Sequence, residues 1–481
     1  MLRSAYLLHP GHTGLRESIS GPHNDFEAVE TTSPVERSAP PSAVKSSRKE
    51  DLMRRSYLLS LALACGALTF VACDETSTSP EIGDDARPTA SVLSQPTPLE
   101  ELGRELYFDK SLSRNGNQSC AECHDPKFGF TGPKVAVNKG GSVYAGSFRQ
   151  RFGARKPPSA AYATFAPIFY YDDAEGLWIG GNFWDGRATG EKLGNPAADQ
   201  ALGPFLNPVE QALPDPSCVV YLVREGNYAD LFYAVWGTAL ADVEFPDDMK
   251  QQCRQSGADF DVAFTAEEEV ALAAAYDQVG LSIAAFEASP EVNPFSSKFD
   301  AWRAGTAEFT DLEEWGFELF TGAQAKCADC HPVDDAVGGL FTDFSFDNLG
   351  LPRNPANPIY TIDPTFVDLG LGGVLPDPDE YGKHKVPTLR NVDKRPGTQA
   401  TKAFGHNGYF KSLEQIVHFY NTRDVKDVCP GPYTADEAVA ADCWPAPEVA
   451  VNENVSELGN LGLTAEEEAA VVAFMRTLSD E

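Results

Sequence analysis

Basic side chains are scarce in this chain. Lysine and arginine number 38 among 481 residues, against 71 aspartates and glutamates, which gives a formal net charge of −33. Because so acidic a chain repels nucleic-acid phosphates, we expect no nucleic-acid partner. A basic protein or a small molecule is the more natural partner. Solubility or salt tolerance alone is a second explanation of the charge.

Long hydrophobic runs are also missing, apart from one near the N-terminus. Residues 57–72 are apolar, follow a short basic stretch that begins at Met53, and end before Cys73. We interpret residues 1–72 as a misassigned start plus a signal peptide, with the true start at Met53. Cys73 closes an imperfect lipobox, so the protein is expected in the periplasm, either lipid-anchored at Cys73 or simply secreted. Residues 73–96 predict a flexible tether, and no other stretch is long and apolar enough to span a membrane.

What the chain does have is two CxxCH motifs. Two thiols at this spacing can bond covalently to the vinyl groups of one haem, and the adjacent histidine then reaches the iron. A zinc site or a redox-active CxxC is the alternative, but the secretion signal and the histidine in both copies favour two haem c groups. The expected ligands are Cys120, Cys123 and His124 for the first haem, and Cys327, Cys330 and His331 for the second.

Each motif lies within a similar run of elements, which suggests an internal duplication. Capping boxes at Thr97 and Thr310 predict a helix before each CxxCH, and capping boxes at Thr265 and Thr464 predict a closing helix after it. Long stretches rich in Gly, Pro, Asn and Asp lie between them. The expected fold is mainly α, with two cytochrome c-like domains, residues 97–292 and 293–481, each wrapping one covalently bound haem, with long loops.

Four further cysteines of the expected mature chain remain after the haem motifs and Cys73. An oxidising compartment allows them to form disulfides. The simplest pairing is Cys218 with Cys253 and Cys429 with Cys443, one bond within each half of the chain. Two other connectivities stay open from the sequence alone.

Several longer motifs resemble those of one known family. They are Leu102–Asp109 (LGRELYFD), Phe183–Arg187 (FWDGR), Gly203–Glu210 (GPFLNPVE), Val386–Asn391 (VPTLRN) and His406–Gly408 (HNG). With both CxxCH sites, they make residues 102–478 similar to the bacterial diheme cytochrome c peroxidase and MauG family. The resemblance implies that the N-terminal haem reacts with hydrogen peroxide and the C-terminal haem stores or relays electrons.

The same resemblance implies roles for two further residues. Trp184 matches the family tryptophan that lies between the haems and helps charge to pass. The alternative is that Trp184 is only a core aromatic residue packed beside a haem. Glu210 matches the carboxylate of the peroxide pocket, which suits the chemistry because splitting peroxide requires a proton to move between its oxygens. A solvated surface glutamate is the alternative for Glu210.

Missing histidines and methionines bear on the remaining iron positions. No histidine lies between His124 and His331, where the family's peroxidases carry a second ligand, so we expect the first haem to be five-coordinate or to hold water. Where those peroxidases have a methionine for the second haem, this chain has Tyr420, as MauG-like members do. Tyr420 is therefore the expected axial ligand, and a tyrosine that only packs on its helix is the alternative.

The family often binds calcium between the haems through an asparagine side chain and two carbonyls. Lys156 replaces that asparagine here, and an ammonium group cannot ligate calcium, so calcium binding stays open. We expect His384 and His418 to be hydrogen-bonded residues, and His406 to have a structural role near a haem edge.

These features together predict an enzyme, a diheme c-type peroxidase that reduces hydrogen peroxide with electrons from a small donor protein. A basic cytochrome c or cupredoxin would suit the acidic chain as donor. One alternative is a MauG-like oxidase of a partner protein or another substrate. Another is a diheme electron-transfer cytochrome without catalysis, although a pure carrier gains by keeping both irons six-coordinate.

Overall fold

The computed structural model describes residues 95–255, 260–333 and 338–481. The predicted signal peptide, the lipid-attachment residue Cys73 and all but the end of the tether lie outside the described residues. Within the described part, no helix is long and apolar enough to cross a bilayer.

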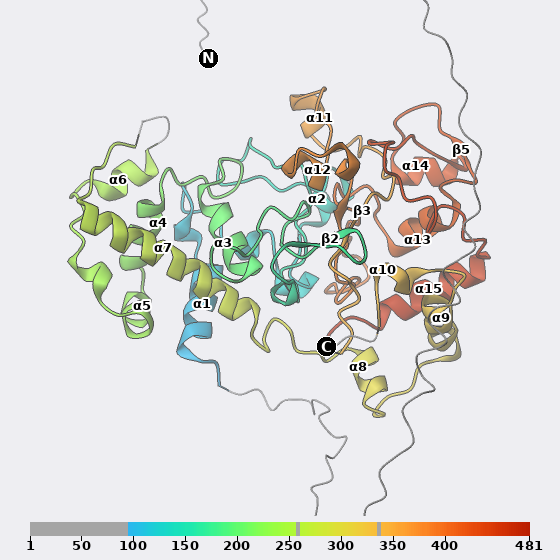
Figure 1. Cartoon of the computed structure of the whole chain (residues 1–481), viewed down its shortest axis with the longest axis horizontal. Coiled ribbons are helices and arrows are strands. Elements are labelled where there is room, and N and C mark those ends of the chain that lie inside the picture. Colours follow the sequence, from blue (N-terminus) through green and yellow to red (C-terminus); the bar gives the residue numbers. More distant parts are fainter. Residues whose placement is uncertain (1–94, 256–259, 334–337) are drawn as a thin grey trace, which may run out of the picture. The chain divides into compact units, whose positions relative to one another are not determined.

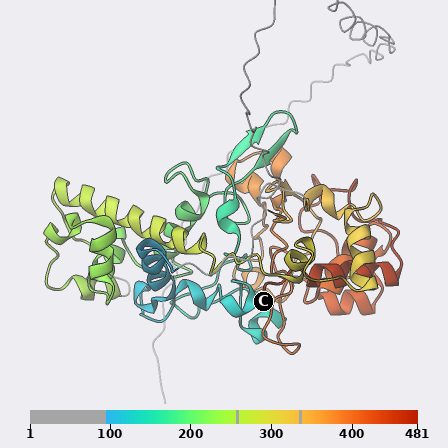
Figure 2. The ribbon, with the colours of Figure 1, turned by 90° about the horizontal axis from the view of Figure 1, so that it is seen from below.

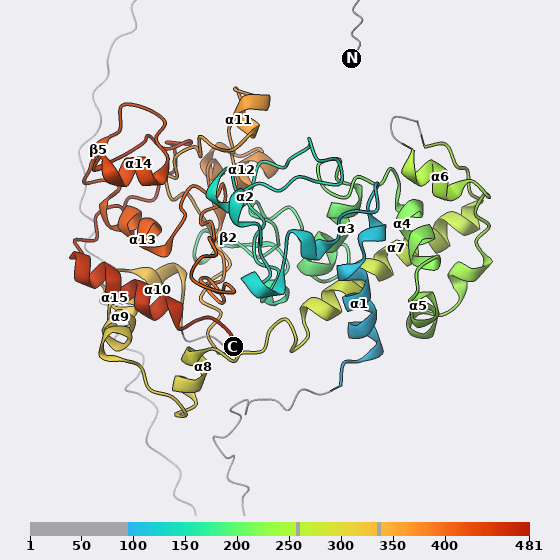
Figure 3. The same cartoon turned by 180° about the vertical axis from the view of Figure 1, so that it is seen from behind.

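Two pairs of packed helices organise these residues. Helix α1 (Pro98–Phe108) packs on α7 (Ala266–Glu287), and α9 (Asp311–Thr321) packs on α15 (Ala465–Arg476). Figure 1 shows the first pair toward one end of the body and the second toward the other, and Figure 3 shows both pairs from behind. In each pair the first helix precedes a CxxCH motif and the second closes that half of the chain. The duplication predicted from the sequence is therefore present in the fold.

All four helices begin at their predicted caps. Thr97, Thr265, Thr310 and Thr464 each accept a hydrogen bond from the backbone N–H three residues on, and a glutamate there accepts from the threonine N–H. These bonds satisfy N–H groups that have no partner inside the helix. Four short local patterns thus fix where the main helices start.

A glycine lies at the crossing point of each pair. A Cβ atom at Gly103 would lie 1.9 Å from the carbonyl oxygen of Ser282, and one at Gly316 would lie 1.9 Å from that of Ala470. Only a residue without a side chain lets the two backbones approach this closely. The sequence analysis did not identify these glycines, because each contact joins helices far apart in the chain.

Each half has its own cluster of buried apolar side chains. The first includes Leu106 and Val279, with α3 (Pro196–Leu206) and α4 (Pro216–Arg224) packed on α7. The second includes Phe320 and Phe474, with α13 (Leu413–Thr422) packed on α15. The predicted domain boundary between residues 292 and 293 stays a prediction.

Two disulfides join the cysteines in the simplest pairing. Cys218 of α4 bonds to Cys253 of α6 (Met249–Arg254), and Cys429 bonds to Cys443. Neither bond crosses from one half of the chain to the other.

Strands are few and short, as a mainly helical fold predicts. Strand β1 (Tyr170–Asp172) forms an antiparallel hairpin with β2 (Leu177–Ile179), which stands out from the helices in Figure 2. Strand β3 (Phe346–Asp347) pairs with β4 (His384–Lys385), and β5 (Asp427–Val428) with β6 (Cys443–Trp444). The remaining helices are α2 (Val135–Lys139), α5 (Ala229–Trp236), α8 (Lys298–Arg303), α10 (Cys327–Cys330), α11 (Ile359–Ile362), α12 (Leu371–Val374) and α14 (Ala435–Ala440). Long loops join them around the site.

Candidate functional site

One continuous cavity of about 830 Å³ is lined by both CxxCH motifs. Cys120, Cys123, Cys327 and Cys330 are free thiols on its wall, although the other described cysteines all form disulfides. Thiols that face a shared cavity, instead of pairing with one another, are available to bond to a ligand. The cavity therefore fits the covalent attachment that the two motifs predict.

The two motif histidines are oriented for coordination. Nδ1 of His124 lies 3.2 Å from the carbonyl oxygen of Phe130, and Nδ1 of His331 lies 2.7 Å from that of Phe341. A nitrogen that faces a carbonyl carries the hydrogen, which leaves the lone pair on Nε2. Burial lowers the pKa of His124 to about 4, so this ring is neutral. A neutral imidazole held by its far nitrogen is what an iron ligand requires.

Three lysines also line the cavity: Lys402 is buried, and Lys156 and Lys385 are half-buried. Lys156 donates to the carbonyl oxygen of Pro157 at 3.1 Å, Lys402 donates to that of Phe128 at 2.9 Å, and Lys385 bonds to that of Gly181. None of them has a carboxylate within ion-pair distance in the described part of the chain. Burial lowers the pKa of Lys156 to about 8 and that of Lys385 to about 7. Amino groups that contact neutral oxygens and no carboxylate suit a ligand that brings its own carboxylates, as haem does with its two propionates.

Glu210 lies in the loop after α3, on the cavity wall beside the first motif. Burial raises the pKa of its carboxyl group. Burial and then the charge of Glu210 raise the pKa of Cys123 to about 12, which indicates that this carboxylate is near the first CxxCH. Glu210 is half-buried, and its role as the carboxylate of the peroxide pocket stays a prediction.

Trp184 lines the same cavity, and hydrogen bonds fix both its side chain and its backbone. Its indole Nε1–H donates to the carbonyl oxygen of Lys156 at 2.8 Å, and its own carbonyl accepts from the N–H of Lys385 at 2.9 Å. The ring is 8% exposed. Lys156 and Lys385 come from opposite halves of the chain, so Trp184 is fixed where the two halves meet.

Tyr420 lies on α13 and lines the cavity near the second motif. Burial raises the pKa of its phenol well above the usual value, and the thiol of Cys330 and the carboxylate of Asp347 raise it further. The phenol thus lies in the surroundings of the second CxxCH, as an axial ligand has to. The same side chain also packs against the second apolar cluster, so its ligand role stays a prediction.

The other histidines are placed largely as expected. His418 lies 2.9 Å from a carboxylate oxygen of Glu468, and Nδ1 of His384 lies 3.0 Å from the carbonyl oxygen of Gly382. His406 is buried on the cavity wall, and its carbonyl oxygen accepts from the N–H of Lys156 at 2.8 Å.

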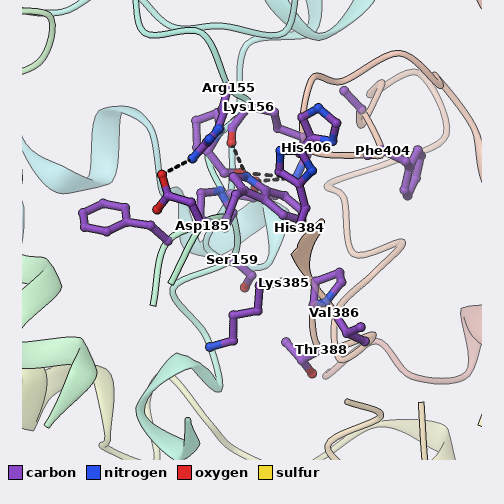
Figure 4. Close-up of a pocket in the computed structure, with 18 of the residues that line it drawn as sticks. Arg155, Lys156, Ser159, Asp185, His384, Lys385, Val386, Thr388, Phe404 and His406 are labelled. Carbon is purple, nitrogen blue, oxygen red and sulfur yellow. Dashed lines mark hydrogen bonds and ion pairs between the residues drawn. The ribbon is translucent and has the colours of Figure 1, made fainter. Parts of the chain in front are cut away.

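Sequence reasoning missed a buried polar network beside Trp184. Arg155 donates to both carboxylate oxygens of Asp368, at 2.6 and 2.7 Å, and to Asp185 of the FWDGR motif at 2.5 Å. Figure 4 shows Arg155 reaching Asp185 near the stacked rings of His384 and His406. Only Asp185 lay in a motif, so the pattern of the sequence gave little signal for the others.

A buried glutamate near the first motif was also missed. Glu287 ends α7, is 4% exposed and lines the cavity. Burial raises its pKa to about 8, so its carboxyl group is largely protonated at neutral pH.

Comparison with known proteins gives consistent similarities. A sequence profile of the di-haem cytochrome c peroxidase family matches residues 97–308. The methylamine utilization protein MauG of Paracoccus denitrificans is 35% identical over 405 residues, covering 82% of this chain and 92% of that protein. The cytochrome c551 peroxidase of Nitrosomonas europaea is 26% identical, covering 76% of this chain and 84% of that protein. The crystal structure of the diheme peroxidase BthA from Burkholderia thailandensis superposes with a TM-score of 0.61 at 28% identity, covering 82% of this chain and 89% of that chain.

Proposed function

This chain belongs to the diheme cytochrome c peroxidase and MauG family of haem oxidoreductases, and we propose that it reduces hydrogen peroxide at the first CxxCH site with electrons from a small donor protein. The observation that carries the proposal is the single cavity that joins both CxxCH motifs to Glu210, Trp184 and Tyr420. A haem bound covalently at each motif would supply the redox-active iron.

We assign separate roles to the residues around that cavity. His124 and His331 would each hold a haem iron through Nε2, and Tyr420 would help to hold the iron of the second haem. Glu210 would accept a proton from one peroxide oxygen and return it to the other as the O–O bond breaks. Two further protons and two electrons then complete the reduction of one peroxide to two waters.

Trp184 is the proposed route for charge between the two sites. Its ring lies on the wall of the shared cavity, and its backbone and indole nitrogen are both hydrogen-bonded. A rigid aromatic ring in this position keeps the separation between donor and acceptor constant. The acidic chain suits a basic donor protein, and the N-terminal sequence supports a periplasmic location with lipid attachment at Cys73 as an option.

Oxidation of a partner protein is the second candidate function. It is favoured by Tyr420 in the place of a methionine and by the 35% identity to a MauG protein. In that case the two electrons would come from side chains of the partner, and peroxide would still be the oxidant.

A stopped-flow experiment tests the proposed class of enzyme. The protein with both haems ferric is mixed with peroxide, first alone and then with a reduced basic cytochrome c. We expect a rapid spectral change without prior reduction, followed by recovery when the donor is present. A change without recovery would favour the oxidase, and no reaction in any redox state would leave only an electron carrier.

A further inference from the structure

A buried cluster of metal-binding side chains lies on the cavity wall apart from both CxxCH motifs. Asp368, His384 and His406 each offer one ligand atom, and these atoms all lie within 4.8 Å of one another. All three residues are buried, with exposures of 5%, 8% and 7%. His384 belongs to β4, and the other two lie in loops before and after it.

The hydrogen bonding of His384 leaves a lone pair without a partner. Because its Nδ1 faces the carbonyl oxygen of Gly382, the neutral ring carries its hydrogen there and has its lone pair on Nε2. This Nε2 lies 3.3 Å from Oδ1 of Asp368. The two groups form an ion pair if the ring is protonated, and they face each other as two acceptors if it is neutral. Two acceptors that face each other in a dry interior repel, unless a cation lies between them.

The neighbouring His406 also has an imidazole nitrogen without a hydrogen-bond partner. Its Nε2 is buried without a hydrogen-bond partner and lies 3.9 Å from the second carboxylate oxygen of Asp368. The rings of His384 and His406 stack with their centroids 3.5 Å apart (Figure 4). Protonation of His384 would remove the repulsion between its Nε2 and Asp368, but Nε2 of His406 would still lack a hydrogen-bond partner.

From these contacts we propose that Asp368, His384 and His406 bind a divalent transition-metal ion of the Zn²⁺ class. Two donors on one tetrahedral ion lie about 3.4 Å apart, which is close to the 3.3 and 3.9 Å that separate the imidazole nitrogens from Asp368. Because the two rings lie parallel, one of them has to tilt for both lone pairs to meet the ion. Two imidazoles and one carboxylate favour such an ion over calcium, which prefers oxygen ligands.

The surroundings supply the outer contacts that metal ligands require. Gly382 fixes the ring of His384, and Arg155 holds the carboxylate of Asp368 through two hydrogen bonds. Oδ2 of Asp368 accepts only from Arg155 and keeps a second lone pair for the ion, whereas Oδ1 also accepts from the N–H of Gly370 at 3.1 Å. Through Arg155 the ion would be linked to Asp185, the neighbour of Trp184, so the site would also stiffen the region between the two CxxCH motifs.

Metal titration of the protein with both haems attached tests this site. The protein is dialysed against a zinc chelator, freed of the chelator, and titrated with Zn²⁺ by calorimetry, and bound zinc is counted against haem iron by mass spectrometry. We expect one Zn²⁺ per chain and a melting temperature that rises with Zn²⁺. Excess Ca²⁺ should not displace it.

Two variants and one matched control assign the ligands. H406Q and D368N should each weaken Zn²⁺ binding by about 100-fold or more, the upper scale of losses seen even for outer contacts. H418Q removes a histidine that pairs with Glu468 away from the cavity, and it should bind Zn²⁺ like the parent protein. Because D368N also disturbs Arg155, each variant is first checked for two covalent haems. Absence of zinc binding in the parent overturns the proposal, and so does undiminished binding in H406Q.

Discussion

The indole N–H of Trp184 donates a hydrogen bond to the carbonyl oxygen of Lys156, and the ammonium group of the same lysine lies 5.7 Å from the centroid of the indole ring. One residue thus fixes the orientation of the tryptophan and places a positive charge over its face. A positive charge there disfavours electron loss from the ring. The pair therefore positions the proposed relay and makes oxidation of its ring less favourable.

The first prediction concerns charge transfer through Trp184. In W184F an aromatic ring is kept, although a smaller one, and the indole N–H and the more easily oxidised ring are lost. Both haem spectra should stay as in the parent, while oxidation of the second haem after peroxide reaches the first should become slower. Rapid mixing with detection at each haem band measures this. An unchanged transfer rate would remove Trp184 from the route.

The second prediction concerns proton transfer by Glu210. E210Q should still bind peroxide but cleave it about 10²-fold more slowly or worse, the usual scale of general acid-base assistance. Because burial raises the pKa of Glu210 and the carboxylate accepts the proton, the parent rate should fall as the pH drops through that raised pKa. The rate of E210Q should not show this decrease at low pH. E175Q, in the exposed turn between β1 and β2, serves as the control.

The third prediction concerns Tyr420. A phenolate is a hard anionic donor and stabilises ferric iron, whereas a methionine thioether raises the reduction potential. Y420M should therefore raise the potential of the second haem in a spectroelectrochemical titration, and Y420F should change its absorption and magnetic resonance spectra. Y433F is a control on a partly buried tyrosine outside the cavity. If Y420F leaves the second haem's spectra as they are, Tyr420 is a packing residue.

The fourth prediction concerns the helix crossings. In G316A the new methyl group would meet the carbonyl oxygen of Ala470 at 1.9 Å, so α9 and α15 have to move apart. We expect a loss of stability of about 1–3 kcal/mol or more, as in overpacked cores, measured by denaturant unfolding. G431A, whose nearest neighbouring atom would be 3.7 Å away, should cost much less. Equal stability of the two variants would contradict the close crossing.

The sequence by itself determined the features that depend on a few neighbouring residues. Two CxxCH motifs specify haem attachment because the two thiols and the histidine lie within five residues. Four capping boxes specify where the main helices begin because their hydrogen bonds span one helical turn. The simplest disulfide pairing followed from the order of the cysteines and is the one observed.

Only the tertiary structure decided what lies around the cavity. Arg155, Asp185 and Asp368 meet from three separate loops. His384 of β4 stacks on His406 of a later loop, although pattern reasoning had treated the two histidines as unrelated. Loop residues follow no helical or strand period, so the sequence carries no regular signal of their contacts. Their positions depend instead on how α1, α7, α9 and α15 pack, because those helices set where each loop begins and ends.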